Sequence, residues 1–71
     1  DYKSQIQIFF QKNYGYIPIY KVLSEIGPPH NKKFKVSIED KKNKLSIGSG
    51  KTKKEAQNNA AKKALVKFNQ I

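Results

Sequence analysis

The stretch Gly48-Ser-Gly-Lys-Thr-Lys-Lys-Glu-Ala56 decides the fold of this chain, together with the small residues that follow it at Ala60, Ala61 and Ala64. It places a short glycine turn before a helix that is expected to start at Thr52. Thr52 can cap this helix, and Glu55, three residues on, completes a capping box. The alanines recur at helical spacing, and their small side chains let the helix lie close against a sheet.

The start of this helix is strongly basic, with Lys51, Lys53 and Lys54 around the capping threonine. A helix N-terminus already attracts anions through its unpaired N–H groups and its dipole. The pattern therefore predicts a phosphate clamp. It is not a nucleotide-binding fingerprint, because the GxxxxGK[ST] and GxGxxG spacings are both absent.

The rest of the chain predicts one helix and three strands ahead of this last helix. Residues 2–13 read as a helix, with Ile6 and Phe10 on one face and Lys3, Gln7 and Gln11 on another, ended by Gly15 and Pro18. Residues 19–25 are expected to be extended, with Tyr20 and Val22 on one face. A second strand is predicted where the apolar residues Phe34, Val36 and Ile38 alternate with the polar residues Lys35, Ser37 and Glu39. A third is predicted where Leu45 and Ile47 alternate with Ser46 and Gly48. A polar turn is expected from Asp40 to Asn43, and the last helix runs from about Thr52 to Phe68. The expected fold class is α+β, in the order α-β-β-β-α, with both helices packed on the apolar face of a three-stranded antiparallel sheet.

Length and composition narrow the choice of partner. Residues 1–71 suit a single domain, expected to be a piece of a longer protein because the chain starts without methionine. The net charge is +10, and all fifteen basic residues are lysine. This points to a polyanion, with nucleic acid first and an anionic membrane surface second. Alternatively, the positive charge reflects only a lysine-biased composition that keeps the surface soluble, and it then implies no binding partner. No membrane-spanning run or signal peptide is recognisable in the sequence, and a cytoplasmic location is expected, or a nuclear one in a eukaryote.

Two further segments are candidates for nucleic-acid contact. Gln7 and Gln11 lie one turn apart on the polar side of the first helix, where amides suit 2′-hydroxyls and base edges. Pro29 and His30 stand at the tip of a proline-stiffened loop that could enter a shallow groove. Taken singly, exposed glutamines and a lone loop histidine are ordinary surface, so each signal alone is weak.

In combination, these elements resemble a double-stranded RNA-binding domain over essentially the whole chain. The opening residues and the two glutamines are similar to the C-terminal RNA-binding domain of bacterial ribonuclease III. The pieces that carry the resemblance stand in order at family spacing: Pro18-x-Tyr20, Gly27-Pro28-Pro29-His30, Phe34-x-Val36, Gly48-x-Gly50-x-Thr52-Lys53-Lys54-x-Ala56 and Ala60-Ala61-x-x-Ala64-Leu65.

The resemblance implies a role for each candidate. Gln7 and Gln11 would meet one minor groove, and His30 with the backbone around Pro29 would meet the next. The helix start would grip the phosphates of the major groove between them, through Lys51, Thr52, Lys53 and Lys54. The footprint would be roughly 16 base pairs. The family often has a glutamate after the first glutamine; here Ile8 stands there, which removes one minor-groove acceptor.

The sequence therefore predicts a domain that binds double-stranded RNA by shape, as the substrate-binding part of a ribonuclease III-type endonuclease. No cofactor, metal site, small-molecule substrate or catalytic constellation is expected in the chain itself, because its acidic residues are scattered. Any cleavage would belong to a catalytic domain elsewhere in the parent protein. The alternatives are a protein-interaction or dimerisation module of the same fold, which should lack the helix-start lysines or the loop histidine, and a single-strand binder, which should expose aromatic stacking platforms.

Overall fold

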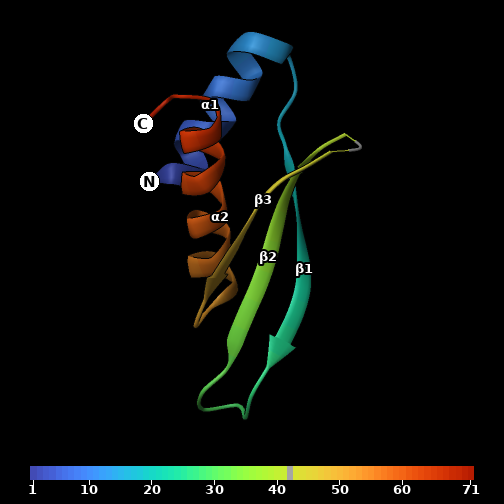
Figure 1. The fold of residues 1–71 in the computed structure, drawn as a ribbon, viewed down its shortest axis with the longest axis vertical. Helices are drawn as coiled ribbons and strands as arrows, with labels where there is room; N and C mark the ends of the chain where they lie inside the picture. The colour runs from blue at the N-terminus through green and yellow to red at the C-terminus, as the bar shows by residue number, and fades with distance from the viewer. Residues whose placement is uncertain (42) are drawn as a thin grey trace.

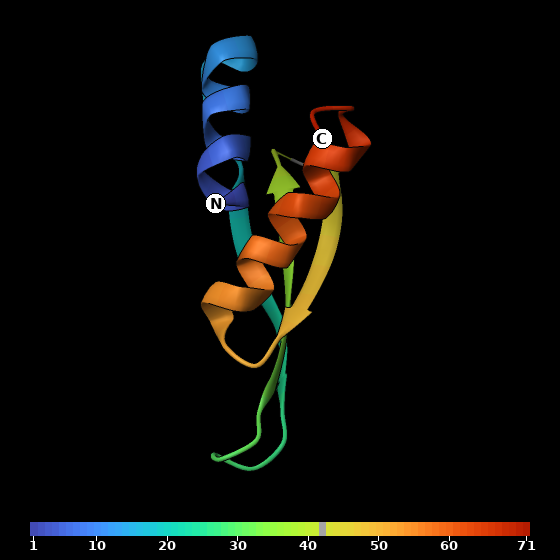
Figure 2. The same ribbon diagram turned by 90° about the vertical axis from the view of Figure 1, so that its left-hand side faces the viewer.

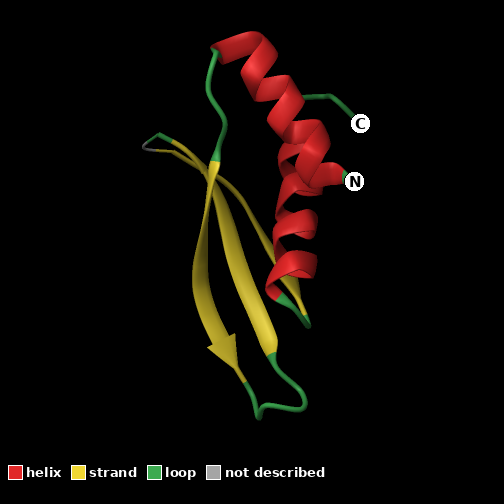
Figure 3. Ribbon diagram, turned by 180° about the vertical axis from the view of Figure 1, so that it is seen from behind, coloured by secondary structure: helices red, strands yellow, loops and turns green. Residues whose placement is uncertain are grey.

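The computed structural model describes residues 1–41 and 43–71 and has the predicted order of elements (Figure 1). The elements are α1 (Tyr2–Tyr14), β1 (Ile19–Ile26), β2 (Lys33–Asp40), β3 (Asn43–Gly50) and α2 (Lys53–Lys67). The strands form one antiparallel sheet in the order β1-β2-β3. Both helices lie on the same side of this sheet (Figure 3), so the predicted fold class is confirmed. The polar turn predicted at 40–43 includes Lys42, which lies outside the described residues.

Local signals set the limits of α1. The Asp1 carboxylate caps the helix, since Oδ1 accepts a hydrogen bond from the Ser4 N–H at 2.8 Å. At the other end, Gly15 adopts a left-handed conformation (φ 79°), and its N–H donates to the Gln11 carbonyl oxygen at 3.1 Å. The predicted end of this helix at Gly15 is therefore confirmed.

The core lies between α2, α1 and the middle strand. The alanine stripe is fully buried, as are Ile6 and Phe10 of α1 and Val36 and Ile38 of β2. Phe68, just after α2, packs on the second half of α1, with its ring centroid 5.3 Å from that of Phe9 and 5.4 Å from that of Phe10. Helix α2 packs on β3 and β2, while α1 packs mainly on α2.

The side of β3 that faces α2 carries small residues. The Ser46 hydroxyl donates to the Ala60 carbonyl oxygen at 2.6 Å, and a Cβ added at Gly48 would lie 2.2 Å from the Ala60 nitrogen. Ile47 pairs with Ser37 on the opposite face of the sheet. The predicted alternation in β3 is therefore wrong at Ile47, which lies on the face away from the helices, whereas Leu45 packs against the core as expected. The helix lies so close to this strand that no larger side chain fits between the two backbones.

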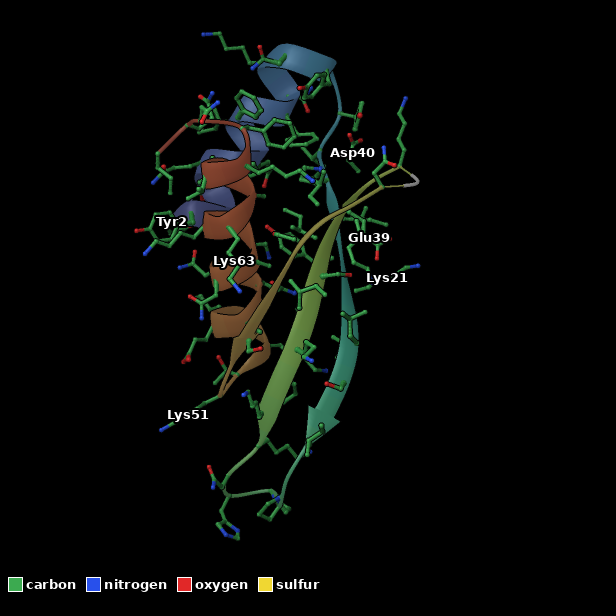
Figure 4. The ribbon with its side chains drawn as sticks, in the orientation of Figure 1. Tyr2, Lys21, Glu39, Asp40, Lys51 and Lys63 are labelled. Carbon is green, nitrogen blue, oxygen red and sulfur yellow. The ribbon has the colours of Figure 1, made fainter. Side chains whose placement is uncertain are left out.

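The opposite face of the sheet also differs from its predicted wet character. Ser37 is completely buried, and its hydroxyl donates to Glu39 Oε2 at 2.8 Å. Glu39 lies 3.7 Å from Lys21 Nζ, on the side of the sheet away from the helices (Figure 4). Val22 shares the helix-facing side with Tyr20, as predicted, but is 47% exposed because α2 covers β2 and β3 instead of this part of β1.

Candidate nucleic-acid interface

The candidate segments lie along one side of an elongated molecule, 40 Å on its longest axis (Figure 2). Helix α1 is at one end of this side, and the β1–β2 loop is at the other. The start of α2 lies between them. Residues that are far apart in the sequence are thus brought into one row, in the spatial order α1, α2 start, loop.

On α1, Gln7 and Gln11 are exposed and one helical turn apart. Lys3, one turn before Gln7, extends this row toward α2. Its Nζ donates to Gln57 Oε1 at 2.9 Å and stands 5.3 Å from the centre of the Tyr20 ring. Burial raises the pKa of the Tyr20 hydroxyl to about 12, so this side chain stays uncharged at neutral pH. The sequence pattern had placed Lys3 on the same face as the glutamines but assigned it no role.

The β1–β2 loop is shaped by a tight turn. Gly27 has a φ of 105°, and a Cβ there would lie 2.4 Å from the Asn31 carbonyl oxygen, so the position requires glycine. The Asn31 N–H donates to the Pro28 carbonyl oxygen at 2.9 Å. Pro29 and His30 are exposed at the tip of this loop.

An ion pair at the base of this loop connects β1 to the residue just before β2. The Lys32 ammonium hydrogen-bonds and pairs with the Glu25 carboxylate. This hydrogen bond holds the pKa of Glu25 below its usual range. The positive charge of Lys32 is thus partly balanced within the protein. The tip itself carries Pro29 and His30, and Lys32 lines the same hollow as these two residues.

At the start of α2, Thr52 is the N-cap and its hydroxyl oxygen accepts from the Glu55 N–H at 3.0 Å, as predicted. The other half of the predicted capping box is different. Glu55 Oε1 accepts from the Lys51 N–H at 3.4 Å instead of from that of Thr52. Lys53 and Lys54 are the first two residues of the helix, and both side chains are exposed.

Lys51 lies beside the β1–β2 loop as well as beside the start of α2. It projects from the connection between β3 and α2 (Figure 4). Together with Pro29 and His30 it lines a hollow of about 410 Å³. The structure therefore places the loop and the helix start around one shared hollow, which could not be predicted from the local sequence pattern.

Exposed basic and polar side chains characterise the candidate segments. Among residues 1–41 and 43–71 no three His, Cys, Asp or Glu side chains come together as a metal site. No helix in this part of the chain combines the length and apolar character needed to cross a bilayer. Exposed lysines and amides dominate the row instead, and such groups bind phosphate and hydroxyl oxygens.

Residues 2–67 match the family model of the double-stranded RNA binding motif. The chain belongs to this family. The solution structure of DRB4 dsRBD2 has the same fold, with a TM-score of 0.67 at 30% identity, covering 100% of this chain and 99% of that one. The fold and the resemblance predicted from the sequence are both confirmed for this double-stranded RNA-binding domain.

Bacterial proteins named Ribonuclease 3 are similar to this domain over nearly its whole length. The Bacillus licheniformis protein is 46% identical over 68 residues, which are 96% of this chain and 27% of that protein. The Anoxybacillus flavithermus protein is 44% identical over 71 residues, covering 100% of this chain and 30% of the relative. The Borreliella burgdorferi protein is 49% identical over 65 residues, covering 92% and 26%. The chain thus spans less than a third of the length of these relatives.

Proposed function

We propose that this domain binds duplex RNA by its shape, with α1 in one minor groove and the β1–β2 loop in the next. Lys53 and Lys54 then grip the phosphates on the rims of the major groove between them, with Lys51 and Thr52 beside them. The observation that supports this most is the spatial order in Figure 2, where the start of α2 lies between α1 and the loop. This order matches a duplex on which a major groove separates two minor grooves.

The side chains in the row suit A-form RNA better than DNA. Gln7 and Gln11 can each donate to and accept from a 2′-hydroxyl, which DNA lacks. The deep major groove of RNA cannot be read by side chains, so lysine contacts to its phosphates are what this position can use. The chain has no arginine for bidentate guanine contacts, and this favours recognition with little dependence on base sequence.

We further propose that the domain holds the substrate for a ribonuclease III-type endonuclease. This rests on the similarity to Ribonuclease 3 proteins that are more than three times as long as the matched segment. The acidic residues of this chain are spread over different elements, and the cleavage chemistry would come from a catalytic domain in the remaining part of such a protein.

A gel-shift series with one RNA duplex of about 20 base pairs, the DNA duplex of the same sequence and one single RNA strand tests the main proposal. We expect the RNA duplex to bind at least about tenfold more tightly than either competitor at physiological salt, because only it offers 2′-hydroxyls at A-form spacing. Equal affinity for the two duplexes would contradict shape-based RNA binding. Tighter binding of the single strand would favour a stacking mode instead.

Substitution of His30 by alanine is expected to weaken duplex RNA binding by roughly tenfold, since a groove contact at the loop tip is lost. If His30 acts as a neutral hydrogen-bonding group, the slope of log affinity against log salt should stay nearly unchanged. A salt titration of the wild type and His30→Ala measures both quantities. A slope that falls by about one unit would show instead that His30 acts as a cation near phosphate.

A further inference from the structure

The first turn of α1 is capped by a side chain from the other helix. Asn58 Oδ1 accepts from the Tyr2 N–H at 3.0 Å and from the Lys3 N–H at 3.3 Å. N–H groups in the first turn of a helix have no acceptor within it. The Asp1 carboxylate accepts from the Ser4 N–H, and the Asp1 carbonyl oxygen accepts from the Gln5 N–H. The cap of α1 is therefore partly a tertiary contact, made by a residue 56 positions away from Tyr2.

This contact is one of several that hold α1 against α2, since Ile6 and Phe10 of α1 also share the buried core with the alanines of α2. At the far end, Phe68 packs on Phe9 and Phe10 with centroid distances of 5.3 and 5.4 Å. At the near end, Asn58 and the 2.9 Å hydrogen bond from Lys3 to Gln57 add polar contacts to the packing of Tyr2. Apolar contacts are not directional, whereas hydrogen bonds have defined geometry. The hydrogen bonds at the near end therefore add a directional constraint on α1 that the apolar contacts lack.

Asn58 also lies close to the proposed phosphate clamp. Asn58 follows Lys54 by four residues on α2, so the two side chains lie on one face of the helix, one turn apart. A hollow of about 400 Å³ connects the starts of the two helices at this point. It is lined by Asp1, Lys3, Thr52, Lys54, Glu55 and Asn58.

We propose that Asn58 is a positioning residue, which sets the placement of Gln7 and Gln11 relative to Lys53 and Lys54. This inference rests on the proposed function, since it concerns the spacing between a minor-groove contact and a major-groove clamp. Without the Asn58 cap, the start of α1 can shift relative to α2 about the buried contacts of Ile6 and Phe10. The glutamines then no longer reach the groove while the lysines hold their phosphates. Asn58 itself needs no contact with RNA.

The test is a double-mutant cycle on duplex RNA affinity, which separates coupling from independent losses. In the wild-type background, the pair Gln7→Ala and Gln11→Ala is expected to weaken binding about tenfold, and in the Asn58→Ala background less than about twofold. The pair Lys53→Ala and Lys54→Ala should cost the same factor in both backgrounds, because these lysines are on α2 itself. A purely structural role for Asn58 would leave the cost of both pairs unchanged.

Two further variants make the test specific. Asn58→Asp keeps an acceptor for the Tyr2 and Lys3 N–H groups, and its negative charge is favourable at a helix start. In this background the glutamine pair should again weaken binding about tenfold, as in the wild type. Asn59→Ala is the matched control. It removes the neighbouring amide, which donates to the Ser49 carbonyl oxygen at 2.7 Å, and should leave the cycle as in the wild type. If Asn58→Ala does not fold, Asn58→Gln replaces it, because the extra methylene displaces the acceptor.

The outcomes are distinguishable. A wild type that does not favour duplex RNA overturns the proposed function and this inference with it. A wild type that binds duplex RNA, with a glutamine effect equally large in the wild-type and Asn58→Ala backgrounds, overturns the positioning role alone. Failure of Asn58→Asp to restore the coupling likewise counts against the cap as its cause.

Discussion

Replacing Lys53 and Lys54 together by alanine is expected to weaken binding of duplex RNA by about 100-fold, if each lysine makes one charge-assisted contact worth ~1.5 kcal/mol. Loss of the two phosphate contacts should also make the affinity less dependent on salt concentration. The slope of log affinity against log salt should fall by roughly one to two units. A salt titration of the wild type and the double variant measures both effects.

The domain should remain folded when these lysines are removed. Both side chains are exposed on the first turn of α2, where a positive charge opposes the helix dipole, and the Thr52 cap does not depend on them. Circular dichroism should therefore show the wild-type spectrum and a similar melting temperature. If the double variant lost its fold as well as its binding, unfolding would explain the loss and the clamp would be contradicted.

The matched control is the pair Lys62→Ala and Lys63→Ala, which removes the same charge from the same helix. Lys62 and Lys63 are exposed about two turns beyond the clamp (Figure 4 labels Lys63), and Lys62 Nζ stands 5.4 Å from the centre of the Tyr2 ring. If only net charge matters, this pair should weaken binding as strongly as the clamp pair. We expect a loss of about threefold at most, since long-range effects of exposed charges are screened by salt.

The change with the largest expected effect on stability is Gly48→Ala. A Cβ at Gly48 would lie 2.2 Å from the Ala60 nitrogen and 2.5 Å from the Ala56 carbonyl oxygen. Both are backbone atoms of α2, so the whole helix must move away from β3 to relieve the clash. We expect the free energy of unfolding to fall by about 3 kcal/mol or more, as for strong overpacking. A domain of this size has a total stability of roughly 4–10 kcal/mol.

Thermal unfolding followed by circular dichroism measures this effect. The melting temperature of Gly48→Ala should drop by about 12–24 °C, given roughly 4–8 °C per kcal/mol for small domains. Gly15→Ala is the control, because nothing lies within 4 Å of its added Cβ and only the left-handed φ of 79° is unfavourable. That variant should lose about 1 kcal/mol. Equal losses for the two variants would mean that the close approach of α2 to β3 is not what makes Gly48 necessary.

The sequence by itself determined the order of the elements, the ends of both helices and the location of the positive charge. These features depend on signals between near neighbours in the chain. Gly15 ends α1 by its own backbone conformation, and Thr52 caps α2 by a hydrogen bond to Glu55, three residues away. Periodicity alone was sufficient to assign the alanines of α2 to the core.

Only the tertiary structure decided which residues meet across elements. Alternation in β3 could not show that Ser46 and Gly48 face α2 while Ile47 pairs with Ser37, because the distance of closest approach depends on a helix later in the chain. The hollow that Lys51 shares with the loop was likewise absent from the pattern. So was the cap that Asn58 provides for α1. A local pattern carries the preference of each segment for its own conformation, whereas these contacts exist only once the packed core has brought distant segments within hydrogen-bonding distance.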